Sequence, residues 1–224
     1  MQNSQPSPRA VARQYGSTHK SRENSRMSQA ATVQPQQPVP AIVYVVFSAE
    51  ITPQTTEGLL AVMANCATQG VQTVYLAIST PGGDVTQGMT LYNVLRGMPF
   101  ELITHNAGNV DSIGNAVFLA GAKRYACPHS TFMFHGVGFN MANQTIRLEE
   151  KNVREMLDNI SSNHGRIGTI LKERTQLTDA VVPELFRQAQ TKDAAFAVGC
   201  GIVDEIRDIH IPPGSTVISL VFQR

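Results

Sequence analysis

After an N-terminal tail, the chain alternates short β-branched apolar runs with longer segments in which apolar residues recur at helical spacing. The elements that this pattern predicts are strands over Ile42–Phe47, Val71–Ile78 and Phe100–Asn106 and helices over Thr52–Gln69 and Thr86–Met98. Strand and helix in regular alternation predict an α/β fold with a largely parallel sheet.

The second half of the chain continues the alternation with less regular spacing. Ile113–Ala122 has the composition of a short buried helix, and Thr131–His135 that of a strand. Thr145–Arg174 carries one apolar stripe at helical spacing, which predicts a long amphipathic helix. Gly165 and Gly168 lower helix stability, so we expect a bend or a break there.

The sequence divides into three regions. Residues 1–40 are rich in Gln, Ser, Pro and Arg and have few large apolar residues, so we expect a disordered tail. An organellar transit peptide and an adaptor-binding tail are alternative interpretations of its basic, acid-poor composition. Residues 41–207 contain most of the alternating elements and form one predicted domain. Residues 208–224 extend it, with Thr216–Phe222 as an added strand or a contact between subunits.

Composition excludes several classes of function. A net charge of +1 gives no reason to expect a nucleic-acid partner. The three cysteines are odd in number and widely spaced, which indicates buried thiols in a reducing compartment and neither a disulfide framework nor a metal site. The apolar runs are too short to cross a bilayer, and we expect no secretory leader. No phosphate-loop or dinucleotide spacing is present.

Ser112 lies at a predicted loop-to-helix junction, between Gly108 and Gly114. Unpaired N–H groups and the helix dipole favour a negative oxygen at such a place. An acyl-transfer enzyme needs this arrangement, because its tetrahedral intermediate carries an oxyanion. The simpler interpretation is that Ser112 or Asp111 only caps the helix.

Four motifs in order resemble the proteolytic subunit of the Clp protease family, over about Ile42 to Ile206. The family's nucleophile lies in a Gly-x-x-x-Ser-x-Gly context, as Ser112 does here. The other three motifs are the Pro81-Gly82-Gly83 turn after a strand, the run Ala120–Pro128 followed by Phe132–His135, and Gly201–Ile206. The resemblance implies the spiral of β-β-α units shared by Clp peptidases and crotonases, with Thr145–Arg174 as a protruding handle helix.

The resemblance also implies roles for individual residues. Ser112 is the expected nucleophile, His135 the general base, and the N–H groups of Gly83 and Ile113 the oxyanion hole. In the family, the segment matching Gly136–Asn140 pairs with the substrate backbone, although an ordinary loop is an equal alternative.

The family's third catalytic residue, an aspartate, is not evident. Ungapped counting back from Asp204 places Ala189 at its position, and the remaining candidates are Gln190 and Asp193. A neutral amide in place of that aspartate lowers the rate of a Ser-His-Asp protease by roughly 10⁴. Asp111 is a second departure, since the family usually has a small residue before the nucleophile.

These expectations define a leading function and two alternatives. The leading one is a Clp-type serine endopeptidase that cleaves unfolded polypeptides or short peptides without a cofactor. The resemblance implies a single or stacked ring of identical subunits and an AAA+ unfoldase as partner. We expect a cytoplasmic protein, or an organellar one if the tail is a transit peptide. The alternatives are a weak or inactive subunit of a mixed ring, and a crotonase-type acyl-CoA enzyme, which the Ser-His pattern disfavours.

Overall fold

The structure is a computed structural model that describes residues 40–138 and 149–222. It divides the chain into two units, Met1–Gln37 and Pro38–Arg224. Every described residue belongs to the second unit. The predicted disordered tail lies outside the described residues except for Pro40, and so does the part of the predicted substrate segment beyond Gly138.

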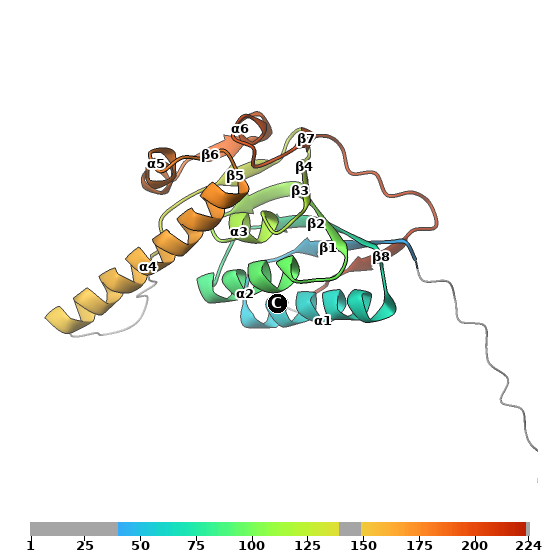
Figure 1. Cartoon of the computed structure of the whole chain (residues 1–224), viewed down its shortest axis with the longest axis horizontal. Coiled ribbons are helices and arrows are strands. Elements are labelled where there is room, and N and C mark those ends of the chain that lie inside the picture. The colour runs from blue at the N-terminus through green and yellow to red at the C-terminus, as the bar shows by residue number, and fades with distance from the viewer. Residues whose placement is uncertain (1–39, 139–148, 223–224) are drawn as a thin grey trace, which may run out of the picture. The chain divides into compact units, whose positions relative to one another are not determined.

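The described strands form one 8-stranded sheet (Figure 1). They are β1 (Ile42–Ser48), β2 (Thr73–Thr80), β3 (Glu101–Asp111), β4 (Lys123–Ala126), β5 (Thr131–Met133), β6 (Thr191–Asp193), β7 (Glu205–Ile206) and β8 (Thr216–Ser219). The order is β6-β5-β3-β2-β1-β8, and β4 pairs with β3 and β7. Every pairing is parallel except that of β5 with β6. The predicted α/β fold with a largely parallel sheet is confirmed.

The helices of the described part are α1 (Pro53–Gln69), α2 (Val85–Arg96), α3 (Gly114–Phe118), α4 (Glu150–Arg174), α5 (Val181–Gln188) and α6 (Ala194–Gly199). Thr52 caps α1 in a capping box and Pro53 opens it, as the sequence predicts. Figure 1 shows α1 and α2 side by side along one face of the sheet, with α5 and α6 beside β6.

Several strands differ from the sequence prediction, because strand pairing depends on partners that are distant in the chain. β3 continues past Asn106 to Asp111, since its last residues pair with Thr131–Met133. β4, which the sequence analysis did not predict, pairs with β3 on the same side. β5 ends at Met133, so His135 follows the strand and does not lie in it.

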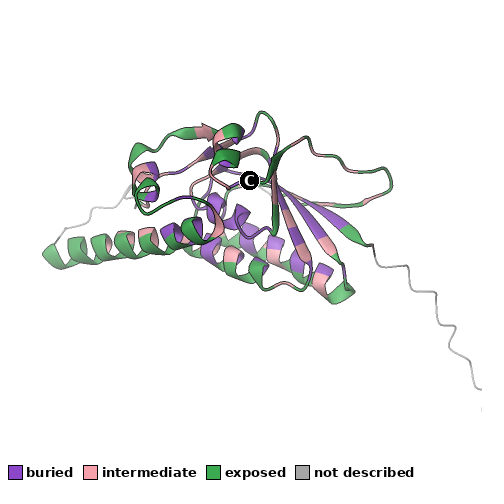
Figure 2. Cartoon of the chain, turned by 45° about the horizontal axis from the view of Figure 1, so that its top comes forward, coloured by how far each residue is buried: buried purple, intermediate pink, exposed green. Residues whose placement is uncertain are grey.

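The long amphipathic helix is continuous, so the expected break at Gly165 and Gly168 is wrong. Gly168 is buried, and a Cβ there would lie 3.4 Å from Val182 Cγ1. Gly168 thus lies at the contact between α4 and α5. Only the C-terminal part of α4 is buried in the described structure, and its N-terminal half extends beyond the other elements (Figure 2).

The C-terminal extension completes the sheet. β8 pairs with β1, so of the two alternatives for Thr216–Phe222 the added strand is the one observed. Phe222 packs edge-on against Phe47, with ring centroids 6.1 Å apart. Phe47 has no exposed surface, so the extension covers part of the core.

Candidate active site

Ser112 occupies a strained turn between β3 and α3. Its φ is 56°, in the left-handed region that side chains other than glycine seldom adopt. Its N–H donates to Met133 O at 2.8 Å, which ties the turn to the end of β5. The buried side chain of Asn115 reinforces the same link, because its amide donates to Ser112 O at 3.0 Å and to Met133 O at 2.9 Å.

The Pro-Gly-Gly turn lies directly against this serine. A Cβ on Gly82 would stand 2.6 Å from Ser112 Cβ, and one on Gly83 would stand 2.2 Å from Ile51 O. Both glycines have positive φ, of 89° and 142°. The two motifs therefore meet in space, and the contact leaves no room for a side chain on the turn.

Two backbone amides near Ser112 remain without a protein acceptor. The hydrogen bonds beside Gly83 are made by its neighbours, Ile51 N–H to Gly82 O at 2.7 Å and Asp84 N–H to Ile51 O at 2.8 Å. Within the described ranges, neither Gly83 N–H nor Ile113 N–H donates to another residue. Free N–H groups beside a serine are the donors that an oxyanion requires.

His135 faces the same space as Ser112. Both are half-buried and line one cavity of about 530 Å³, together with Gly83, Ile113 and Asn115. Within the described part of the chain, the Ser112 hydroxyl has no hydrogen-bond partner, His135 included. Hydrogen bonds between a nucleophile and its base are often long without substrate and shorten when substrate binds.

A backbone carbonyl orients the His135 ring. The Nδ1–H of His135 donates to Gly136 O at 2.7 Å. With the proton on Nδ1, Nε2 carries the lone pair, which is the tautomer that accepts a proton from a serine hydroxyl. Gly136 O thus occupies the place that an aspartate has in a Ser-His-Asp triad, but without a charge.

The two candidates for a third catalytic side chain lie elsewhere. Gln190 is exposed and its Oε1 accepts from Lys192 Nζ at 3.1 Å. Asp193 caps α6, with Oδ1 accepting from Phe196 N–H at 2.8 Å. The structure brings neither of them to the His135 ring.

Asp111 neither caps α3 nor lines the Ser112 cavity. Its Oδ2 accepts from Asn109 Nδ2 at 2.7 Å, so it is not a cap of α3. It is not among the residues that line the cavity beside Ser112.

The other histidines near this segment are occupied or exposed. His105 is buried against Tyr75 and Arg207, and His129 is exposed. His164 accepts a hydrogen bond from Val137 N–H. His135 remains the histidine of this group that lines the Ser112 cavity.

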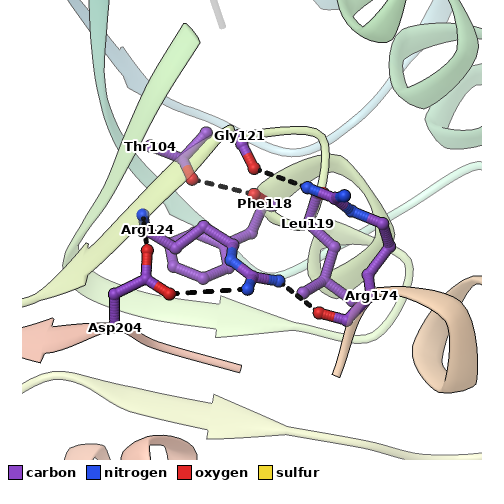
Figure 3. Close-up of polar contacts among 7 residues, drawn as sticks. All are labelled: Thr104, Phe118, Leu119, Gly121, Arg124, Arg174 and Asp204. Carbon is purple, nitrogen blue, oxygen red and sulfur yellow. Dashed lines mark hydrogen bonds and ion pairs between the residues drawn. The ribbon is translucent and has the colours of Figure 1, made fainter. Parts of the chain in front are cut away.

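Side chains from distant elements bind the C-terminal end of α3, at the opposite end from Ser112. Thr104 Oγ1–H donates to Phe118 O at 2.8 Å, and the Arg174 guanidinium donates to Leu119 O at 3.1 Å and to Gly121 O at 2.9 Å (Figure 3). These carbonyls lie at or just beyond the last residue of α3, the helix that follows Ser112. Burial, followed by the charges of Arg96 and Arg124, lowers the pKa of Arg174. The sequence analysis did not identify Asn115 or Arg174, since an Asn or Arg in a helix has no specific local signature.

The described ranges contain no group of three or more His, Cys, Asp or Glu side chains placed to hold a metal ion. None of their helices is both long and apolar enough to span a bilayer.

Proteins similar to this chain include proteolytic subunits of ATP-dependent Clp proteases. The proteolytic subunit 1 of the ATP-dependent Clp protease of Corynebacterium jeikeium is 37% identical over 83 residues, which are 34% of this chain and 44% of that protein. Proteolytic subunit 1 of Leifsonia xyli is 29% identical over 139 residues, 60% of this chain and 67% of that protein. The chain spans about half the length of several of the curated relatives that it matches.

A solved structure supports the same fold. A ClpP1 mutant from Listeria monocytogenes superimposes with a TM-score of 0.63 at 19% identity, covering 74% of this chain and 91% of that one. The sequence model described as Clp protease matches residues 33–210, well over half of the chain. The chain therefore belongs to the Clp protease family.

Proposed function

We propose that the protein is a serine endopeptidase of the Clp type, which hydrolyses peptide bonds of unfolded polypeptides or short peptides through an acyl-enzyme. One observation carries the proposal. Ser112 and His135 line the same cavity as two amides, Gly83 N–H and Ile113 N–H, that have no acceptor within the described ranges. A nucleophile, a base and an oxyanion site are the parts that acyl transfer needs.

Each part has a defined task. Ser112 Oγ attacks the scissile carbonyl carbon while His135 Nε2 takes the hydroxyl proton, and the two amides bind the oxyanion. His135 then gives that proton to the leaving amine, which leaves an ester on Ser112. Water, losing its proton to the same Nε2, attacks the ester, and Ser112 recovers its hydrogen as the carboxylic acid departs.

The substrate is expected to be an extended polypeptide beside Gly138, because both backbone groups of Gly136 and the N–H of Val137 are already hydrogen-bonded within the chain. Apolar side chains of Phe134, Ile167 and Phe186 line the cavity next to Ser112. Backbone pairing together with an apolar cavity accepts many sequences, as degradation of unfolded chains requires.

A second candidate function is favoured by the uncharged partner of His135. Gly136 O orients the ring but stabilises the imidazolium less than a carboxylate does. The protein would then be a weak or inactive subunit that assembles with an active relative. Slow labelling of the isolated protein, with activity only in a mixed ring, would distinguish this function from the first.

Assembly and location belong to the same proposal. We expect a ring of identical subunits, single or stacked, that receives substrate from an AAA+ unfoldase in the cytoplasm. The exposed apolar side chains Val153 and Leu157 on α4, 41% and 56% exposed, support a contact between subunits.

A fluorophosphonate probe tests the chemistry directly, because it reacts with an activated serine. We expect the assembled protein to gain one probe by intact mass, with the label on Ser112. Ser112→Ala should abolish labelling, whereas Ser162→Ala, at an exposed serine on α4, should leave it unchanged. An assembled wild-type protein that stays unlabelled over hours would contradict the peptidase proposal.

A further inference from the structure

A thin wall separates two cavities on either side of the segment that follows His135. One is the cavity of about 530 Å³ beside Ser112. The other, of about 430 Å³, is lined largely by residues of α4 and α5. Gly136, whose carbonyl orients the His135 ring, and Phe186 on α5 line both cavities. These two residues therefore form the wall between the cavities.

This segment is held by one hydrogen bond at each of three successive residues. His135 Nδ1–H donates to Gly136 O, Gly136 N–H donates to Phe186 O at 3.1 Å, and Val137 N–H donates to His164 Nε2 at 2.7 Å. The His164 ring also stacks on Phe186, with centroids 5.2 Å apart and planes at 29°. One imidazole on α4 thus braces both the backbone after the base and the side chain that supports it.

The bond from Val137 depends on the protonation state of His164. An imidazole nitrogen accepts a hydrogen bond only when it carries no proton, so the neutral ring must hold its proton on Nδ1. A second proton would go to Nε2 and turn the acceptor into a donor that faces another N–H. The bond would then be lost, and Val137 N–H would be left unsatisfied in a half-buried site.

The charges around the ring are already paired. Lys172 on α4 binds Asp179 at 2.6 Å, and Arg187 on α5 binds Glu184 at 2.6 Å. Asp179, the carboxylate that lines the same cavity as His164, is thus paired with Lys172.

We propose that His164 is a positioning residue whose neutral ring holds the His135–Val137 segment in its catalytic conformation, and that its protonation releases this segment and switches the site off. The inference rests on the proposed peptidase function. The conformation of this segment affects the base directly, because His135 is oriented by Gly136 O. In a site without a triad aspartate, the position of that carbonyl depends on how its neighbours are held.

Two variants of His164 separate the role of its acceptor nitrogen from the roles of its stacking and its protonation. His164→Gln supplies an acceptor oxygen that does not titrate, and His164→Phe keeps the stacking on Phe186 but removes the acceptor. At pH 8 we expect His164→Phe to lower the rate constant of Ser112 labelling by about tenfold, and His164→Gln by less than about threefold. His129→Gln, at an exposed histidine, is the control and should leave the rate unchanged.

The pH profile distinguishes positioning from a purely structural role. Two histidines must be unprotonated in the wild-type protein, so the logarithm of its labelling rate should rise with a limiting slope of about 2 on the acid side. His164→Gln should reduce that slope to about 1, while His129→Gln should keep the steep limb. An equally steep limb in His164→Gln would overturn the proton switch.

Hydrogen exchange provides a readout that needs no activity. By mass spectrometry of a peptide that spans residues 134–138, we expect His164→Phe to exchange faster than wild type at pH 8, and His164→Gln to stay protected. Equal protection in wild type and His164→Phe would show that Val137 is not held by this ring. If wild type is protected but never labelled at Ser112, the peptidase proposal fails while the bond to His164 stands.

Discussion

At the scale of single residues, the site depends on backbone groups as much as on side chains. Ser112 has a left-handed φ of 56°, and Gly83 lies so close to Ile51 O that a side chain there would collide with it. His135 takes its tautomer from Gly136 O. The geometry of the candidate site is therefore set largely by main-chain atoms, whose positions follow from the strands and turns that carry them.

A buried histidine away from the site makes stability depend on pH. Burial lowers the pKa of His105 to about 4, although the hydrogen bond to the Arg207 backbone carbonyl acts in the opposite direction. The unfolded chain therefore binds a proton at this residue between about pH 6.5 and 4 while the folded one does not, so stability is full above that range and falls with decreasing pH. From pH 7.5 to 4.5 the loss from His105 should be about 2.5 kcal/mol.

Urea denaturation at these two pH values measures this loss. His105→Gln removes the titrating group, so its free energy of unfolding should fall less between pH 7.5 and 4.5 than that of wild type, whatever its absolute stability. His129→Gln, at an exposed site, should keep the wild-type difference. Equal pH differences in wild type and His105→Gln would contradict this assignment.

At the scale of elements, α3 is positioned from both ends. Ser112 and Asn115 tie its start to β5, and Arg174 at the end of α4 binds the carbonyls of Leu119 and Gly121 beyond its last turn. Arg124 in β4 in turn donates to Arg174 O and pairs with Asp204 at 3.5 Å (Figure 3). The C-terminal end of α4 and the turn before β7 thus share one polar network with the helix that follows Ser112.

Removing the Arg174 guanidinium tests this network. Arg174→Leu keeps an apolar stem but leaves two buried carbonyls without donors, at about 1–3 kcal/mol each. We expect a free energy of unfolding lower by about 2–4 kcal/mol, measured by chemical denaturation. Arg166→Leu, the same change at an exposed position on α4, should cost less than about 0.5 kcal/mol. Similar losses in both variants would exclude a specific role for Arg174.

At the scale of the whole molecule, the N-terminal half of α4 extends from the described domain with no buried residue. Val153 and Leu157 lie four residues apart on one face of its outer half, and both are exposed. Exposed apolar residues on a projecting helix are a common basis for subunit contact. The handle helix predicted from the family resemblance has the position that such a contact requires.

Light scattering coupled to size-exclusion chromatography tests this contact. Leu157→Glu places a charge on the apolar face, so we expect a smaller assembly than wild type at the same protein concentration. Ser162→Glu adds the same charge on the opposite face of α4 and should leave the mass of the assembly unchanged. An unchanged mass in both variants would place the subunit contact elsewhere.

Local patterns were sufficient for much of the architecture. The periodicity of Ile42–Phe47 and of Thr52–Gln69, with Thr52 and Pro53 as start signals, predicted β1 and α1 to within one residue at each boundary. The Ser112 context and the Pro-Gly-Gly turn were recognisable as motifs. These features arise from residues close together in the chain, so the sequence alone carries them.

Tertiary structure decided the remaining features, because they depend on partners far apart in sequence. The polar end of β3 is a strand because it pairs with Thr131–Met133. The carbonyl that orients His135 is a backbone atom, which every residue type possesses. The acceptor for Val137 N–H lies 27 residues further along, on α4. Backbone donors and acceptors are alike in nearly every residue type, so the sequence does not show which of them will bind one another. Only the folded chain shows which backbone groups lie together beside Ser112.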